Sequence, residues 1–255
     1  MTSPAIDSWR LAVGTLTALR VRPPATVDRR IAGRAMLLAP VAVVPLGLLV
    51  ALVTWGGREL GLAPLAVAFI AVGALALGSR AFHLDGLSDV ADGLTASFER
   101  ERSLAVMKGG TAGPAGAAAL VLVLGIQVAS LAAVCTVPRG PVVAGLVVCA
   151  SRAILSVTCT RGLPAARTDG LGQTYVGSVG RAATAVTWLV VAVLLAGMLH
   201  WAGWDWWRGP VVAAAGLLVG AALVRRCVQR FGGVTGDVFG ATVEVTLAAM
   251  LVAAT

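Results

Sequence analysis

Three aspartates gather in one short stretch, AFHLDGLSDVADGL (81–94), of a chain in which only 13% of the residues are charged. We expect the apolar run that ends near residue 78 to continue past Ser79 as a helix. At about 100° per residue, Asp89 then lies about 40° from Asp85, and Asp92 lies about 20° to the other side. The three carboxylates then share one narrow face. Such oxygens suit Mg²⁺, which combines a few carboxylates with water and substrate phosphates. The spacing predicts a magnesium site; the alternative is a solvated helix end, where like charges cost only a few tenths of a kcal/mol.

Two glycines, Gly86 and Gly93, lie side by side next to this acidic face on the same helix. Because glycine has no Cβ, we expect the strip that they form to let a bulky ligand approach the backbone closely. His83 falls about 160° from Asp85, away from the carboxylates, and is interpreted as a histidine that packs between helices.

A second acidic stretch, GGVTGDVFGATVE (232–244), leads into the last apolar run. Asp237 and Glu244 are seven residues apart, so they face one way, and we expect them to contribute to the metal site. Asp237 has the alternative role of a helix N-cap. Glu244 lies about two turns inside the run, where a charge costs roughly 2.5 to 3.5 kcal/mol or more, so it should face a cavity or a cation. A structural pair with Arg152, itself inside an apolar run, is the alternative for Glu244.

Basic residues follow the aspartate stretch at Arg100, Arg102 and Lys108 and occur again at Arg161 and Arg167. Most of them are interpreted as ordinary positive charges of cytoplasmic loops. Arginine can grip phosphate with two parallel hydrogen bonds, which makes Arg152 and Arg167 the better candidates for binding phosphate. Arg167 stands beside a glycine-rich turn in RGLPAARTDGLG.

The elements that position these residues must lie in a membrane, because 58% of the chain is hydrophobic and a soluble domain is roughly one-quarter charged. Most of the apolar stretches approach the ~20 residues that span a bilayer as a helix. They predict an all-α, polytopic membrane protein with about seven transmembrane helices, within a range of six to eight. The stretches fall at about 35–55, 62–78, 114–136, 141–160, 182–202, 211–224 and 238–255.

Lysine and arginine alternate between rich and poor loops, which is the positive-inside pattern. It predicts that the N-terminus and the segments 79–113, 161–181 and 225–237 are cytoplasmic. The net charge of +8 then reflects topology rather than a nucleic-acid partner. Residues 1–34 are expected to be a cytoplasmic or interfacial segment of a single catalytic domain, 1–255.

Together, these features combine acids for Mg²⁺, arginines for phosphate and a cytoplasmic location at a membrane. Phosphoryl or nucleotidyl transfer needs those parts, together with a carboxylate that takes a proton from the attacking hydroxyl.

Four stretches, in order between residues 82 and 244, resemble the cobalamin synthase family, adenosylcobinamide-GDP ribazoletransferase. They are FHLDGLSDVADGL, ERERSLAVMKGGTAGPAG, the pair Ser151–Arg152 with ARTDGLG, and GGVTGDVFGATVE. The resemblance implies a polytopic inner-membrane enzyme that requires Mg²⁺. In that reaction the hydroxyl of alpha-ribazole, or of its 5'-phosphate, attacks the cobinamide-proximal phosphorus of adenosylcobinamide-GDP, and GMP leaves. The resemblance leaves open a homo-oligomer or a complex with other cobalamin-assembly enzymes.

Carried onto this chain, the resemblance assigns Asp85, Asp89 and Asp92 to the metal and pyrophosphate site, which Asp237 and Glu244 complete. It assigns Lys108, Arg152 and Arg167 to the substrate phosphates. Gly109 and Leu247 stand where the family pattern has acids, which places more weight on the three aspartates.

Two other classes of membrane protein account for part of this pattern of acidic residues. A CDP-alcohol phosphotransferase also uses membrane-embedded aspartates and Mg²⁺, but its motif has a longer spacing than the one that Ser88 and Asp89 complete here. A cation transporter would place its acids within the spans, whereas only Glu244 is clearly placed there.

Overall fold

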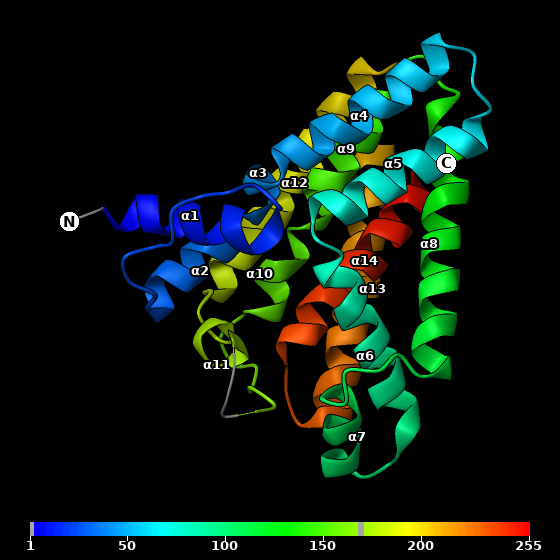
Figure 1. Ribbon diagram of the computed structural model, residues 1–255. Coiled ribbons are helices and arrows are strands. Elements are labelled where there is room, and N and C mark those ends of the chain that lie inside the picture. The colour runs from blue at the N-terminus through cyan, green and yellow to red at the C-terminus, as the bar shows by residue number, and fades with distance from the viewer. Residues whose placement is uncertain (1–2, 168–170) are drawn as a thin grey trace.

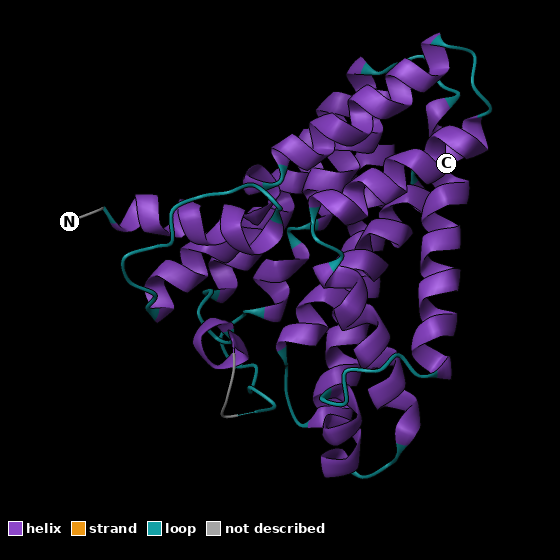
Figure 2. Cartoon of the chain, viewed as in Figure 1, coloured by secondary structure: helices purple, strands orange, loops and turns teal. Residues whose placement is uncertain are grey.

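The computed structural model describes residues 3–167 and 171–255, and in these ranges the chain is helical (Figure 2). The described residues contain no strand, only two isolated β-bridges, Thr160 with Val179 and Ala165 with Val234. The prediction of an all-α protein is confirmed. The helices are α1 (Pro4–Leu16), α2 (Arg29–Leu37), α3 (Ala39–Ala42), α4 (Val44–Glu59), α5 (Pro64–Gly78), α6 (Phe82–Ala96), α7 (Arg100–Met107), α8 (Pro114–Cys135), α9 (Gly140–Ser151), α10 (Ile154–Thr158), α11 (Leu171–Tyr175), α12 (Arg181–Trp201), α13 (Arg208–Phe231) and α14 (Gly236–Ala253).

Five helical segments of the described chain are long and apolar enough to cross a membrane, or six if the bent pair α5–α6 counts as one. The five are α8, the α9–α10 segment, α12, α13 and α14. The expected number was about seven. The first apolar stretch is divided because Pro40 and Pro45 each start a new helix, and a proline is tolerated in the first turn but not in a helix interior.

The helix α5 does not continue past Ser79 into the aspartate stretch, so the expected unbroken helix is wrong. Arg80 and Ala81 have φ angles of 59° and 54°, a left-handed conformation that ends a right-handed helix. The axes of α5 and α6 differ by 93°. Arg80 also donates a hydrogen bond to the carbonyl of Gly14, at 2.7 Å, which ties the break to the N-terminal segment. The aspartates therefore lie on a separate helix with its own direction.

The last helix, α14, lies at the centre of the bundle (Figure 1) and packs against α6, α8, α9, α10 and α13. The α1 and α2 helices lie to one side of the bundle and pack against each other. Residues of α14 are thus held in place by neighbouring helices on several sides.

Glycines allow the long helices to approach closely, as the GxxxG spacing of Gly216 and Gly220 predicts. A Cβ added to Gly216 would lie 2.5 Å from Cγ of Met250, and one added to Gly220 would lie 2.5 Å from Oγ1 of Thr246. Both contacts join α13 to α14. At Gly209, an added Cβ would meet the backbone of Leu195 and Ala196 on α12.

Gly209→Ala should destabilise the protein by roughly 1 to 3 kcal/mol, because the α12 backbone cannot move aside as a side chain can. The midpoint of thermal unfolding in detergent measures this loss. Gly197→Ala is the matched control, since nothing lies within 4 Å of a Cβ at that α12 position, and alanine favours a helix. Equal midpoints for the two variants would contradict the proposed close approach.

Candidate active site

Three of the segments predicted to be cytoplasmic, 79–113, 161–181 and 225–237, meet toward the bottom of Figure 1, whereas the N-terminal helices α1 and α2 lie at the side of the bundle. Arg100 donates a hydrogen bond to the carbonyl of Ala166 at 2.9 Å, and Arg230 donates to the carbonyl of Ser97. The N–H of Val234 donates to the carbonyl of Pro164 at 2.9 Å. These bonds connect α7, the loop before α11, the end of α6 and the turn before α14. The acidic stretches are therefore brought to one place.

Asp237 enters this end from the first turn of α14. Thr235 is the N-cap of that helix, and its Oγ1 accepts a hydrogen bond from the N–H of Val238, so the alternative that Asp237 is the N-cap is wrong. Oδ2 of Asp237 accepts a hydrogen bond from Thr235 Oγ1 at 3.1 Å. The same oxygen lies 3.9 Å from Nη1 of Arg167. The side chain of Asp237 is thus directed to Arg167.

The α6 helix touches α14 at Gly86, where an added Cβ would lie 2.5 Å from the carbonyl oxygen of Asp237. At Gly93, an added Cβ would lie 2.6 Å from Cγ of Met107 on α7. Both glycines are buried. The strip that was expected to admit a ligand is occupied by neighbouring helices, so helix packing accounts for both glycines without a ligand.

Asp85, Asp89 and Asp237, with Arg167, form what we call the carboxylate cluster. Asp85 is exposed and Asp89 is partly exposed. The α6 helix is not one of the five spans. Burial, the largest cause, acts together with the negative charges of Asp85, Asp237 and Asp92 to raise the pKa of the Asp89 carboxyl to about 6, although Arg167 opposes them. The cluster therefore has an excess of negative charge that a bound cation would relieve.

Asp92 lies on the same face of α6 as Asp85 and Asp89, but its carboxylate forms hydrogen bonds with the backbone of another helix. Its Oδ2 accepts a hydrogen bond from the N–H of Gly113 at 2.7 Å, and its Oδ1 accepts one from Gly116 at 2.9 Å. These N–H groups belong to the start of α8, which has no side-chain cap of its own. A carboxylate there satisfies unpaired donors and the positive end of the helix dipole. Asp92 thus anchors α8 to α6 through both of its oxygens.

The donors of the cluster fit an open magnesium site rather than a closed cage. Among the described residues, no three His, Cys, Asp or Glu side chains converge to hold an ion by themselves. Mg²⁺ commonly takes one or two protein carboxylates and completes its shell with water and substrate phosphates. Asp85, Asp89 and Asp237 provide hard oxygen donors of that kind, and the cluster contains one cationic side chain.

Arg167 lies at the edge of the cluster and joins it to α7. Its Nη2 donates a hydrogen bond to the carbonyl of Leu104 at 2.7 Å, and its Nε is buried without a hydrogen bond. Lys108 is the C-cap of α7 and is exposed. The next part of the ARTDGLG stretch, 168–170, lies outside the described residues.

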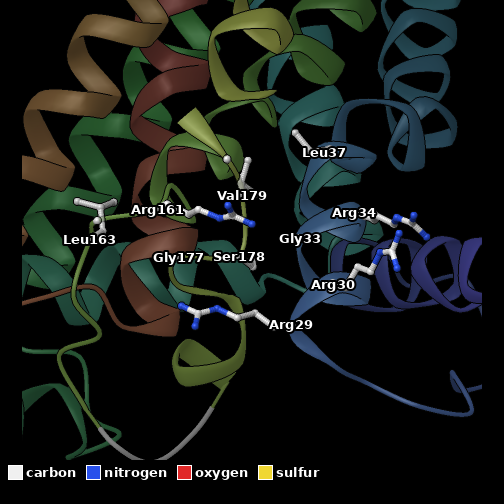
Figure 3. Close-up of a pocket in the computed structure, with 12 residues that line it drawn as sticks. Arg29, Arg30, Gly33, Arg34, Leu37, Arg161, Leu163, Gly177, Ser178 and Val179 are labelled. Atoms are coloured by element: carbon white, nitrogen blue, oxygen red, sulfur yellow. The ribbon is translucent and has the colours of Figure 1, made fainter. Parts of the chain in front are cut away.

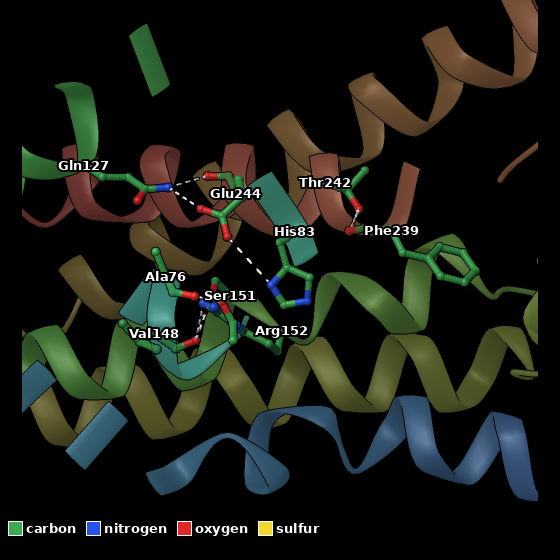
Figure 4. A network of polar contacts seen from close by, with 10 residues as sticks. Ala76, His83, Gln127, Val148, Ser151, Arg152, Phe239, Thr242 and Glu244 are labelled. Carbon is green, nitrogen blue, oxygen red and sulfur yellow. Dashed lines mark hydrogen bonds and ion pairs between the residues drawn. The ribbon is translucent and has the colours of Figure 1, made fainter. Parts of the chain in front are cut away.

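Glu244 is not brought together with the aspartates. It is buried in α14, where its Oε2 accepts a hydrogen bond from Nε2 of Gln127 at 2.8 Å. Its Oε1 lies 3.7 Å from Nδ1 of His83 (Figure 4). The expected place facing a cavity or cation is therefore taken by two polar side chains.

Arg152 is fully buried and lies in the same polar network as Glu244 (Figure 4). It donates hydrogen bonds from Nη1 to the carbonyl of Val148 and to Oγ of Ser151, at 3.1 and 2.8 Å. Among the ion pairs of the described residues, none joins Arg152 to Glu244 within 4.0 Å. Arg152 and Arg167, which were both expected to bind phosphate, thus occupy different environments.

Sequence reasoning missed Gln127 and the contact of His83 with Glu244. His83 is buried between helices, as the interpretation of a packing histidine requires. The available signal was Gln127 itself, a polar residue within the apolar run of α8, where such residues usually have a partner in the protein.

The family model for cobalamin-5-phosphate synthase matches residues 8–255. The chain belongs to this family. The resemblance seen in its four sequence stretches is thereby confirmed, and it extends over nearly the whole chain.

Curated relatives match over nearly the full length of both chains. A Nocardioides sp. protein described as adenosylcobinamide-GDP ribazoletransferase is 54% identical over 97% of each chain. Relatives with the same description from Frankia casuarinae and Pseudomonas paraeruginosa are 37% and 35% identical, over 95% and 98% of this chain and 92% and 98% of their own. No solved structure matches the chain.

Asp92→Ala should lower the free energy of unfolding by about 1 to 2 kcal/mol, because the first turn of α8 loses its capping carboxylate. Asp85→Ala removes an exposed carboxylate from the same helix and should change stability by less than about 0.5 kcal/mol. Thermal unfolding of both variants in detergent measures the difference. If Asp92→Ala were as stable as Asp85→Ala, the anchoring role of Asp92 would be wrong.

Proposed function

We propose that the carboxylate cluster is the active site at which this chain transfers cobinamide phosphate to a ribazole. As a member of its family, the protein is an adenosylcobinamide-GDP ribazoletransferase. The observation that carries the location of the site is the approach of α14 to α6, which brings Asp237 and its partner Arg167 beside the aspartates. The cluster joins residues from three distant parts of the sequence.

The reaction makes one bond and breaks one at phosphorus. The hydroxyl oxygen of alpha-ribazole, or of its 5'-phosphate, bonds to the cobinamide-proximal phosphorus of adenosylcobinamide-GDP. The bond from that phosphorus to the bridging oxygen breaks, and GMP leaves with the bridging oxygen. A carboxylate of the cluster takes the hydroxyl proton, and the raised pKa of Asp89 suits it to hold a proton near neutral pH.

One or two of the carboxylates of Asp85, Asp89 and Asp237 would hold Mg²⁺ together with water and substrate phosphate. The bound ion would neutralise charge on the diphosphate. Arg167 has a guanidinium beside Asp237 and a buried Nε without a hydrogen bond, so it is suited to donate to a substrate phosphate at the cluster. Lys108, at the exposed end of α7, would attract the same anionic substrate.

We propose that the protein lies in the cytoplasmic (inner) membrane with the cluster on the cytoplasmic face. The alternation of basic and non-basic loops supports this orientation. Three of the basic loops are joined by hydrogen bonds at the end of the bundle where the cluster lies. A homo-oligomer or a complex with other cobalamin-assembly enzymes is compatible with this site, although all four cluster residues come from one chain.

Asp89→Asn should lower the rate of GMP release by about two orders of magnitude or more, since the amide neither takes the proton nor binds a cation as well. The assay supplies adenosylcobinamide-GDP, alpha-ribazole and Mg²⁺ to purified protein. Asp205→Asn, at an exposed acid between α12 and α13, is the control and should retain the wild-type rate. GMP release by folded Asp89→Asn at the normal rate would exclude the cluster as the active site.

Removal of divalent metal with EDTA should stop GMP release, and added Mg²⁺ should restore it. Asp237→Asn should then need a higher Mg²⁺ concentration for half of its maximal rate, because one oxygen donor is replaced by a weaker neutral one. Titration of Mg²⁺ against the initial rate measures both effects. An unchanged rate after complete metal removal would contradict the magnesium role.

A further inference from the structure

A cavity of about 680 Å³ lies between α2 and residues 161–163 and 177–180 (Figure 3). Its lining includes Arg29, Arg30, Arg34 and Arg161, and none of the carboxylate cluster residues. We call it the arginine pocket. It is thus a distinct site, although one of its walls belongs to the same segment that holds Arg167 against Asp237.

The side chains of Arg29 and Arg161 extend into the pocket from opposite walls. Figure 3 shows Arg29 extending from α2 toward the loop at Gly177, and Arg161 extending from that side back toward α2. Nη2 of Arg29 donates a hydrogen bond to the carbonyl of Val176 at 2.9 Å. The guanidinium of Arg29 is therefore held in place at the wall, with other donors left available.

Glycines shape the pocket at its narrow points. Gly177 has a φ of +73°, and a Cβ there would lie 2.6 Å from Nη2 of Arg29. A Cβ on Gly33 of α2 would lie 2.6 Å from the carbonyl oxygen of Ser178. The α2 helix can therefore approach the loop closely at Gly33, and the positive φ of Gly177 favours a residue without a side chain at that turn.

One hydroxyl group in the pocket wall has no hydrogen-bond partner among the described residues. Oγ of Ser178, which lines the pocket, is buried and makes no hydrogen bond within the described chain. A buried polar group without a partner costs roughly 1 to 3 kcal/mol, so a ligand that accepts its hydrogen would recover that loss.

The charge of the pocket is uncompensated. Among the described residues, no carboxylate lies within 4.0 Å of the four guanidinium groups. The positive-inside rule explains why arginines lie on this side of the membrane, but it requires neither their convergence on one cavity nor the buried serine hydroxyl.

We propose that the arginine pocket binds the phosphate group of an organic phosphate. The guanidinium groups of the arginines and the serine hydroxyl can donate hydrogen bonds to phosphate oxygens. The four positive charges attract a dianion. Two sources share this chemistry: a soluble phosphate monoester, as on a 5'-phosphorylated ribazole, or the headgroup of an anionic phospholipid. Gly33 and Gly177 are required for the pocket's shape, and Ser178 completes its donors.

The test compares two double variants of equal charge change. Arg34→Gln with Arg161→Gln removes two pocket charges, whereas Arg20→Gln with Arg22→Gln removes two exposed charges before α2 that do not line the pocket. In phosphatidylcholine nanodiscs, calorimetry measures binding of alpha-ribazole 5'-phosphate and of unphosphorylated alpha-ribazole. In nanodiscs with added phosphatidylglycerol, native mass spectrometry measures the anionic lipid retained. Neither measurement needs turnover, so the result is independent of whether the proposed active site is right.

Binding of the monoester, or retention of phosphatidylglycerol, should weaken roughly tenfold or more in the pocket variant and remain unchanged in the control; Ser178→Ala should weaken it in the same arm. A loss confined to the monoester identifies a soluble ligand, and a loss confined to phosphatidylglycerol identifies a lipid. The proposal is overturned if neither ligand binds the wild type, or if both double variants lose binding equally.

Discussion

The candidate active site depends on the close contact between α6 and α14. A Cβ at Gly86 would lie 2.5 Å from the carbonyl oxygen of Asp237, and one at Gly240 would lie 2.9 Å from Cα of His83. Each helix thus contributes a glycine at a point where the other helix's backbone approaches. Because this contact excludes side chains, it brings Asp237 beside a stripe of aspartates far away in the sequence. Like charges repel, so helix packing must hold the cluster together until a cation binds.

Two of the acidic residues stabilise this arrangement rather than completing the cluster. Asp92 receives two N–H groups at the start of α8, and Glu244 receives Gln127 from farther along the same helix. Both acids therefore bind α8, one from α6 and the other from α14. The helix α8 is therefore hydrogen-bonded to both α6 and α14, the two helices whose contact forms the cluster. A buried carboxylate is costly unless its hydrogen bonds are satisfied, so these bonds also specify the position of α8 along its neighbours.

The sequence predicted the helical class, the membrane location and the grouping of the aspartates on one helix face. It could not predict the break at Arg80 and Ala81, because neither residue is a usual choice for a left-handed conformation. It also assigned Asp92 to metal and Gly86 to a ligand, since periodicity gives the direction of a side chain but not its partner. The partner of Asp92 is the backbone of α8, and that of Gly86 is the backbone of α14. Both are long-range contacts that one sequence does not specify.

The segment 161–180 connects the carboxylate cluster with the arginine pocket. At one point its Arg167 meets Asp237; near its ends, Arg161 and Ser178 line the pocket. The segment is held against both neighbours, because Arg29 of α2 donates to Val176 and the ring of Tyr175 meets Phe239 of α14 edge-on at 6.2 Å. A phosphate bound between α2 and this segment would add contacts to a wall that also positions Arg167. The short stretch from Arg161 to Arg167 therefore joins a residue that lines the pocket to the arginine at the cluster.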